Sequence, residues 1–118
     1  MAGMTFFYTA DMTAIDAFYG ERLGAVLWLD QGACRIYRKD DFLFGFCRRE
    51  KAVVGDQILT FFYPDRVHVD EQYQAYRDLA PAAPLYNERF NIYHFFITDP
   101  EGRLVEFQHF EETIDWQF

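Results

Sequence analysis

Four polar residues recur at even spacing in an aromatic-rich stretch near the C-terminal end, and they are the residues best suited to chemistry. Alternate residues of a β-strand share one face, so an imidazole, a hydroxyl, a carboxylate and an amide would project together. A carboxylate beside an imidazole can act as an acid and a base, coordinate a metal ion, or form a polar cluster that contacts a ligand. We favour the ligand-contacting cluster over acid–base catalysis, and both over a metal pair. The four residues are His94, Thr98, Glu106 and Gln108.

A hairpin would hold these side chains in place. Its centre, Asp99-Pro100-Glu101-Gly102, has the composition of a tight turn, because Pro fixes one φ and Gly accepts a positive one. The flanks are rich in aromatic and β-branched residues, which favour strands. Pairing about this turn sets Glu106 opposite Phe96 and His94 opposite Gln108. The other face is apolar and is expected to pack on helices; it consists of Phe95, Ile97, Val105 and Phe107.

Composition limits the class of protein and of partner. The 118 residues are enough for one domain with a real core, and 51% of them are hydrophobic. The load of 14 Phe and 8 Tyr indicates aromatic surface that lines a cavity or a subunit interface. A net charge of −8 argues against nucleic acid and suits neutral or cationic ligands, although solubility alone would also explain it. No apolar run approaches the ~20 residues that span a bilayer.

The two cysteines, Cys34 and Cys47, are not spaced as metal ligands, and the chain shows no signal peptide. Free thiols are the usual state of such cysteines in the cytoplasm. The sequence therefore predicts a cytoplasmic protein with both thiols free.

Two similar series of elements follow one another along the chain, each a strand, a helix and three strands. Thr13 and Asp16 resemble a capping box at the start of the first helix, and Gly24 is a natural stop for it. The predicted strands cover residues 4–8, 26–29, 33–38, 42–47, 58–63 and 85–86 and the hairpin 91–110, and the predicted helices cover about 13–23 and 67–79.

The repeat is also visible in the letters. Thr5-Phe6-Phe7-Tyr8 recurs as Thr60-Phe61-Phe62-Tyr63, and the last two strands of each half align without gaps. The halves cover about residues 1–50 and 57–112 of one domain and are followed by a short acidic tail. The ungapped alignment matches Ile36 with Ile97, Leu43 with Leu104, Phe46 with Phe107, Ala33 with His94, Gly45 with Glu106, and Cys47 with Gln108.

The paired β-α-β-β-β module resembles the vicinal oxygen chelate superfamily, which includes glyoxalase I, the extradiol dioxygenases and the bleomycin resistance proteins. Two motifs carry the resemblance: Asp16-Ala17-Phe18-Tyr19 through Leu23-Gly24, and Asp99-Pro100-Glu101-Gly102 through Glu106-Phe107. The resemblance implies an α+β fold in which two βαβββ modules form cupped mixed sheets with the helices outside. It also implies a homodimer.

The same resemblance implies metal ligands from the first and last strands of each module. Glu106 matches one such position, but the others fall at Gly45 and at about Met4 and Leu59, whose side chains cannot hold a divalent ion. We therefore predict that the usual metal site is absent and that no cofactor is bound. A divalent metal at Glu106 is the alternative.

Further residues are predicted to surround the pocket. Arg35 and Tyr37 are assigned to the same face as Glu106, where Arg35 could neutralise that carboxylate or bind a substrate carboxylate; alternatively, Arg35 points to solvent. Aromatic walls would suit a planar organic ligand, and ordinary core or dimer packing is the alternative for each of them. The predicted walls are Phe6, Tyr8, Phe61, Tyr63 and Phe96.

These observations predict a dimeric, metal-free protein of the bleomycin-resistance type that binds a small organic molecule. The alternatives are a metal-dependent lyase, isomerase or dioxygenase of the same superfamily, and a partner-binding protein whose pocket is vestigial. The predicted partners are a small organic molecule and a second copy of the chain, with no nucleic acid and no membrane.

Overall fold

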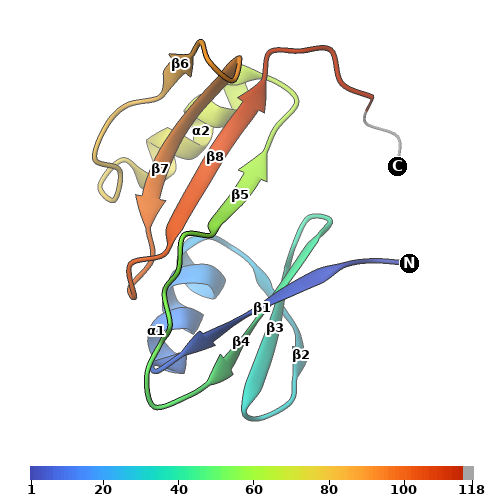
Figure 1. Cartoon of the computed structure of the whole chain (residues 1–118), viewed down its shortest axis with the longest axis vertical. Helices are drawn as coiled ribbons and strands as arrows, with labels where there is room; N and C mark the ends of the chain where they lie inside the picture. The colour runs from blue at the N-terminus through green and yellow to red at the C-terminus, as the bar shows by residue number, and fades with distance from the viewer. Residues whose placement is uncertain (116–118) are drawn as a thin grey trace. The chain divides into compact units, whose positions relative to one another are not determined.

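The computed structural model, drawn in Figure 1, describes residues 1–115. The chain forms two compact units, and each contains one four-stranded sheet. Unit 1 comprises residues 1–55 and 99–101, and unit 2 comprises residues 56–98 and 102–118. Each unit has the predicted order of strand, helix and three strands, so the α+β architecture of two βαβββ modules is confirmed.

The sheet of unit 1 is mixed. Its strand order is β1-β4-β3-β2, with β1 parallel to β4 and the other neighbours antiparallel. Phe44 and Phe46 are fully buried at its centre. The strands are β1 (Met4–Thr9), β2 (Val26–Asp30), β3 (Cys34–Lys39) and β4 (Phe42–Arg48).

The helix of unit 1 begins as α1 (Met12–Ile15) and continues as the π-helical segment η1 (Asp16–Arg22). Its N-cap is Asp11, whose side chain accepts a hydrogen bond from the Ala14 amide at 3.0 Å. The predicted cap at Thr13 was therefore wrong, because an Asp two residues earlier satisfies the free amide first. The helix ends as predicted at Gly24, which has a φ of +75°.

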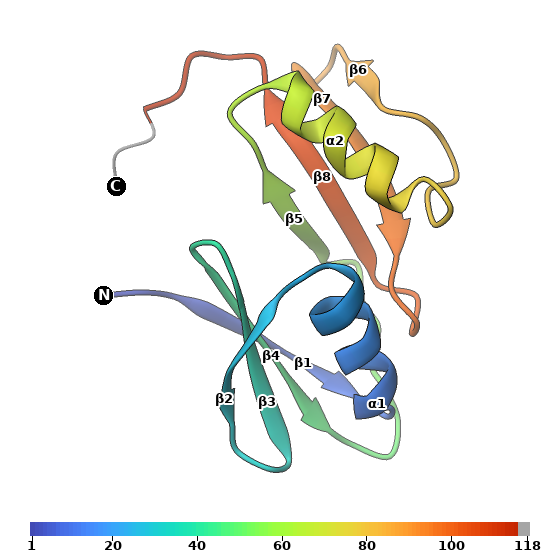
Figure 2. The ribbon, with the colours of Figure 1, turned by 180° about the vertical axis from the view of Figure 1, so that it is seen from behind.

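Unit 2 has the strand order β5-β8-β7-β6, again with one parallel pair, β5 with β8. Its helix α2 (Arg66–Tyr76) is capped by Asp65, which accepts from the His68 amide at 2.9 Å. Figure 2 shows α2 lying across one face of this sheet. The strands are β5 (Ile58–Phe62), β6 (Leu85–Asn87), β7 (Ile92–Thr98) and β8 (Leu104–Phe110).

The core of unit 2 lies between α2 and the sheet, and Phe107 is its centre. The Phe107 ring stacks on Phe95 at 4.9 Å, on Tyr76 at 5.4 Å and on Phe61 at 5.7 Å between centroids. Phe95, Ile97, Val105 and Phe107 are all buried. The predicted apolar face of the hairpin is thus confirmed.

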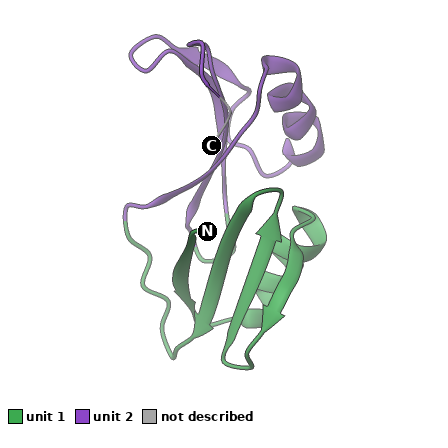
Figure 3. Cartoon of the chain, turned by 90° about the vertical axis from the view of Figure 1, so that its right-hand side faces the viewer, with its two compact units in different colours: residues 1–55, 99–101 green, residues 56–98, 102–118 purple. Residues whose placement is uncertain are grey.

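In each unit the helix lies against one face of the sheet of that unit; Figure 3 draws the two units in different colours. The face that points away from the unit's own helix is called the far face below. Among residues 1–115 no helix is both long enough and apolar enough to cross a membrane.

The two halves differ by one residue in the spacing of their hairpins. Gly45 lies opposite Ile36, whereas its repeat counterpart Glu106 lies opposite Phe96. Ile36 therefore corresponds to Phe96 and not to Ile97, so the ungapped alignment was wrong across β3. A shift of one residue moves every side chain of a strand to the opposite face.

The first strands of the two units, β1 and β5, are also offset by one residue relative to the repeated sequence. Phe6 pairs with Gly45 across β1 and β4, and Thr60 pairs with Glu106 across β5 and β8. The structural counterpart of Phe6 is therefore Thr60, although the repeated letters had matched it with Phe61. The pairing between strands determines on which face of the sheet a side chain lies, and the repeated sequence alone does not.

Candidate functional site

A buried Glu–His pair stands on the far face of the sheet of unit 2. Glu106 on β8 accepts a hydrogen bond through Oε2 from Nδ1 of His94 on β7 at 2.6 Å. Its other oxygen, Oε1, accepts from the Thr60 hydroxyl on β5 at 2.8 Å. The His94 and Glu106 side chains are only 10% and 9% exposed. Three strands thus fix one carboxylate, and both of its oxygens are engaged.

The contact at Nδ1 determines what the rest of the His94 ring can do. With Nδ1–H donating to the carboxylate, Nε2 of the neutral ring carries a lone pair and accepts, whereas a protonated ring donates from both nitrogens. Within residues 1–115, Nε2 has no hydrogen-bond partner. It is therefore available to a ligand.

The neighbouring positions follow the predicted register. Gln108 lies opposite His94, and Phe96 lies opposite Glu106. Gln108 is 8% exposed, and no hydrogen bond from its amide is found in the described part of the chain. The amide atoms are not fully buried, so a ligand can reach them. The Phe96 ring stands edge-on to His94 at 5.0 Å.

A small recess opens beside His94. Its volume is about 70 Å³, well below the roughly 300 Å³ or more of a site for a drug-sized ligand. The recess can take one small apolar group, and the rest of a ligand would lie on the far face. Its lining is Pro81, Ala82, Ala83, Leu85, His94, Phe95 and Phe96.

Thr60 was missed at the level of sequence. The repeated letters assigned it to the helix side, because they matched Phe61 with Phe6. Its hydroxyl is the polar group of β5 that reaches Glu106. A polar residue in an otherwise apolar strand was the available signal.

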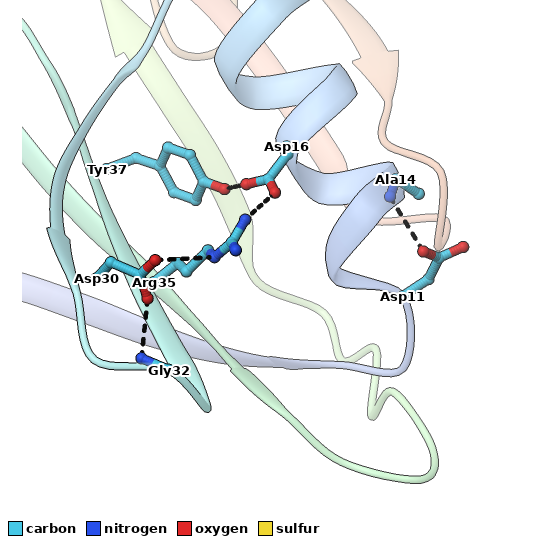
Figure 4. Close-up of polar contacts among 7 residues, drawn as sticks. All are labelled: Asp11, Ala14, Asp16, Asp30, Gly32, Arg35 and Tyr37. Carbon is cyan, nitrogen blue, oxygen red and sulfur yellow. Dashed lines mark hydrogen bonds and ion pairs between the residues drawn. The ribbon is translucent and has the colours of Figure 1, made fainter.

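Arg35 and Tyr37 were assigned to the wrong face. Figure 4 shows both side chains directed at Asp16 of η1, where the Arg35 guanidinium and the Tyr37 hydroxyl each donate to the Asp16 carboxylate. Nε of Arg35 also lies 3.6 Å from Asp30. Both residues therefore tie the helix of unit 1 to its sheet. Arg35 therefore does not point freely to solvent, and it lies on the helix side of its own sheet because of the one-residue offset in β3.

Phe61 and Tyr63 were also placed wrongly. Both rings stack on Phe107, at 5.7 and 6.5 Å, on the side of the sheet that α2 covers. Phe61 is buried in the core and Tyr63 is half-buried beside it, so both lie on the helix side of the sheet. Phe6 and Tyr8 do lie on a far face, but on that of unit 1, and are 49% and 39% exposed.

The cysteines correct a further prediction, because Cys34 and Cys47 form a disulfide. They face each other across β3 and β4 with their Cα atoms 4.0 Å apart. The ungapped alignment had set Ala33, and not Cys34, opposite Cys47, so it did not bring them together. By strand pairing, Cys34 and Cys47 occupy the positions that His94 and Gln108 hold in unit 2.

The residues present do not fit the metal site that the fold implies. In the described chain no three His, Cys, Asp or Glu side chains gather as a metal group. Both oxygens of Glu106 are already engaged by Thr60 and His94. The counterparts in unit 1 are Gly45 and Phe6, which offer no donor side chain.

The turn that carries part of the resemblance has a structural role. Asp99 accepts from the Tyr19 hydroxyl at 2.7 Å and from the Glu101 amide at 2.9 Å. Glu101 accepts from the Thr9 hydroxyl at 2.6 Å and from the Ala10 amide at 3.0 Å. These contacts lie within unit 1, which contains residues 99–101. The turn part of the motif therefore holds the fold together.

Comparison with known proteins agrees with the fold. No protein-family model and no curated protein sequence matches this chain. Among solved structures, a lactoylglutathione lyase from Agrobacterium tumefaciens is 21% identical with a TM-score of 0.75, covering 92% of each chain. A glyoxalase/bleomycin resistance protein/dioxygenase from Nocardioides is 15% identical with a TM-score of 0.77, covering 100% of this chain and 89% of the other.

An integron cassette protein from the metagenome of the Halifax Harbour sewage outfall is also similar, at 15% identity and a TM-score of 0.78. The alignment covers 92% of this chain and 97% of that protein. At these identities the likeness concerns the fold. The chain has the vicinal oxygen chelate fold, that of the glyoxalase, bleomycin resistance and dioxygenase proteins, as its motifs predicted.

Proposed function

We propose that this protein binds a small organic molecule on the far face of unit 2, in the manner of the bleomycin resistance type and without a metal ion. The observation that carries the proposal is a polar cluster of largely buried residues, in which two groups that reach the surface are left open to a ligand. Glu106 holds His94 through Nδ1, which leaves Nε2 and the Gln108 amide without protein partners in the described residues. Groups of this kind orient a ligand by hydrogen bonds within an otherwise apolar site.

The chemistry of the cluster indicates the class of ligand. The Gln108 amide can donate and accept, and Nε2 of a neutral His94 accepts from an O–H or N–H group. The Phe96 ring supplies flat apolar surface beside these groups. Together with the net charge of −8, these groups favour a neutral or cationic molecule with an aromatic part and a hydrogen-bond donor.

The proposed assembly is a homodimer. The edge strand β2 (Val26–Asp30) is exposed at every residue, and Trp28 at its centre is 50% exposed. An apolar edge of this kind is a ready surface for pairing with another chain. We also propose the cytoplasm as the location, where the state of the Cys34–Cys47 pair depends on exchange with cellular thiols.

Binding is tested with a thermal-shift screen of small aromatic and cationic compounds, followed by calorimetric titration of the hits. The variant is Glu106→Gln, and the matched control is Glu112→Gln, an exposed carboxylate in the tail. We expect hits to bind the wild type and the control alike, and Glu106→Gln to lose binding while its circular dichroism stays native. Unchanged binding to Glu106→Gln would exclude this cluster as the recognition element.

Acid–base catalysis is the second candidate function, and the geometry of His94 favours it. Its Nε2 could take a proton from a bound molecule while Glu106 stabilises the resulting imidazolium. Exchange of ligand protons for deuterium, followed by NMR on the screening hits, tests this. Exchange that disappears in His94→Gln supports catalysis, and the absence of exchange in the wild type argues against it.

The metal-dependent lyase, isomerase or dioxygenase alternative has a separate test. Elemental analysis of the purified protein, before and after incubation with divalent ions, measures metal content directly. We expect less than stoichiometric metal, because the cluster offers only Glu106 and His94 as ligands. A stoichiometric ion that Glu106→Gln removes would overturn the metal-free proposal.

A further inference from the structure

The disulfide of unit 1 occupies the strand positions that His94 and Gln108 hold in unit 2. Cys34 and Cys47 face each other on the far face of the first sheet, and both are half-buried. Sulfur in this position can be reached from outside the core. We propose that this pair is a thiol–disulfide exchange site that reacts with a small anionic thiol such as glutathione while the protein stays folded.

The strands do not depend on the disulfide for their pairing. β3 and β4 pair over six residues from Cys34–Cys47 to Lys39–Phe42, and β4 also pairs with β1. Backbone hydrogen bonds continue past the sulfurs, from Arg48 to Ala33 at 2.7 Å and from Gln31 to Cys34 at 2.8 Å. Reduction therefore breaks one bond in a sheet that the backbone still holds together.

A positive charge packs on the residue that neighbours Cys47 across β1 and β4. The Arg49 guanidinium lies 3.5 Å from the centroid of the Tyr8 ring. Tyr8 is the β1 neighbour of Cys47 and projects from the same face. A cation at this place attracts a thiolate reagent and stabilises a cysteine thiolate as it leaves. The local charge thus opposes the repulsion that a chain of net charge −8 exerts on an anionic thiol.

The exchange proceeds in two balanced steps. In the first, the thiolate of the small thiol attacks one Sγ, the Sγ–Sγ bond breaks, and its electron pair leaves on the other cysteine as a thiolate. In the second, another small thiol attacks the mixed disulfide, releasing the second cysteine thiol and a small-molecule disulfide. Two small thiols are oxidised, and their protons end on Cys34 and Cys47.

The test uses the full chain in native buffer with mixtures of reduced and oxidised glutathione. Free thiols are trapped by alkylation and counted by intact mass, and circular dichroism follows the fold. We expect the disulfide to be reduced and re-formed reversibly with the native spectrum unchanged. Reduction that occurs only after denaturant is added would overturn the proposal.

The role of Arg49 has its own control. Arg49→Gln should slow reduction by glutathione by roughly threefold, the effect of one nearby charge on an anionic reagent. Reduction by the neutral thiol 2-mercaptoethanol should be nearly unchanged. Arg77→Gln, the same charge change at the C-terminal end of α2, serves as the control. Equal glutathione rates in the two variants would contradict the assignment of an anionic thiol.

Single-cysteine variants provide an independent measurement. Cys34→Ser and Cys47→Ser each leave one thiol, which oxidised glutathione should convert to a mixed disulfide in the folded protein. Folded variants that take up no glutathione would show that neither sulfur is accessible, and the proposal would fail.

Discussion

Replacement of Thr60 by Val tests the Glu106 cluster without touching its ionisable members. Val keeps the branched shape that strands favour but removes the hydroxyl that donates to Glu106 Oε1 at 2.8 Å. A hydrogen bond to a charged group contributes about 1.5–3 kcal/mol. Thr60 is only half-buried, so water replaces part of this bond. We expect the free energy of unfolding to fall by about 1–2 kcal/mol.

Urea denaturation near neutral pH, followed by circular dichroism, measures this loss. With a slope of about 2 kcal/mol per molar urea, the midpoint should fall by roughly 0.5–1 M. The matched control is Thr5→Val, because Thr5 is exposed on β1 and its hydroxyl makes no hydrogen bond among residues 1–115. That control should stay within about 0.5 kcal/mol of the wild type. Equal midpoints for the two variants would refute the idea that Thr60 stabilises the buried carboxylate.

Three further predictions concern unit 2. Phe107→Ala, at the centre of the aromatic core, should lower the free energy of unfolding by about 3–5 kcal/mol in urea denaturation; a loss below 1 kcal/mol would contradict that placement. The backbone hydrogen bond from His68 lowers the pKa of Asp65 below 3.8, and the hydrogen bond to Asp65 raises the pKa of His68 above 6.5. The stability this pair contributes is therefore complete between pH 3.8 and 6.5. It is lost as pH falls through the folded pKa of Asp65 or rises through that of His68. Asp65→Asn should flatten this part of a plot of Tm against pH, and an unchanged plot would argue against the pair. Burial, with a smaller effect of the hydrogen bond to Asp70, raises the pKa of Tyr93 to about 12. A spectrophotometric titration should show a late-ionising tyrosine that Tyr93→Phe removes.

The sequence predicts the fold well where the residues of a turn and the alternation of polar and apolar residues in its strands indicate the same pairing. The register of β7 and β8 follows from the Pro and Gly of a single turn, and the structure has the predicted pair of His94 with Gln108. Helix ends are harder, because Asp11 and Thr13 are both good N-caps. Only the folded geometry shows that Asp11 receives the amide.

The site was predicted only in part, and the errors share one cause. Similar letters in the two halves do not guarantee similar faces, because one extra residue in a turn inverts a strand. That offset placed Arg35 and Tyr37 on the wrong face, and a second offset did the same for Phe61 and Tyr63. Glu106 and His94 were placed correctly because they lie in the hairpin whose turn was recognised. Their roles in binding remain predictions.

The two halves have kept one backbone arrangement and diverged in the chemistry it presents. In unit 1 the Phe6 ring occupies the space above Gly45, where an added Cβ would lie 2.6 Å from a ring carbon. A carboxylate at position 45 would therefore require Phe6 to move. In unit 2 the corresponding residue is Thr60, and its hydroxyl binds Glu106 instead of excluding it. In unit 1, Gly45 and the Phe6 ring leave no room for a polar side chain at this position of the far face. In unit 2, Thr60 and Glu106 make the same position polar. This contrast is why we propose hydrogen-bonded recognition in the second half and thiol exchange in the first.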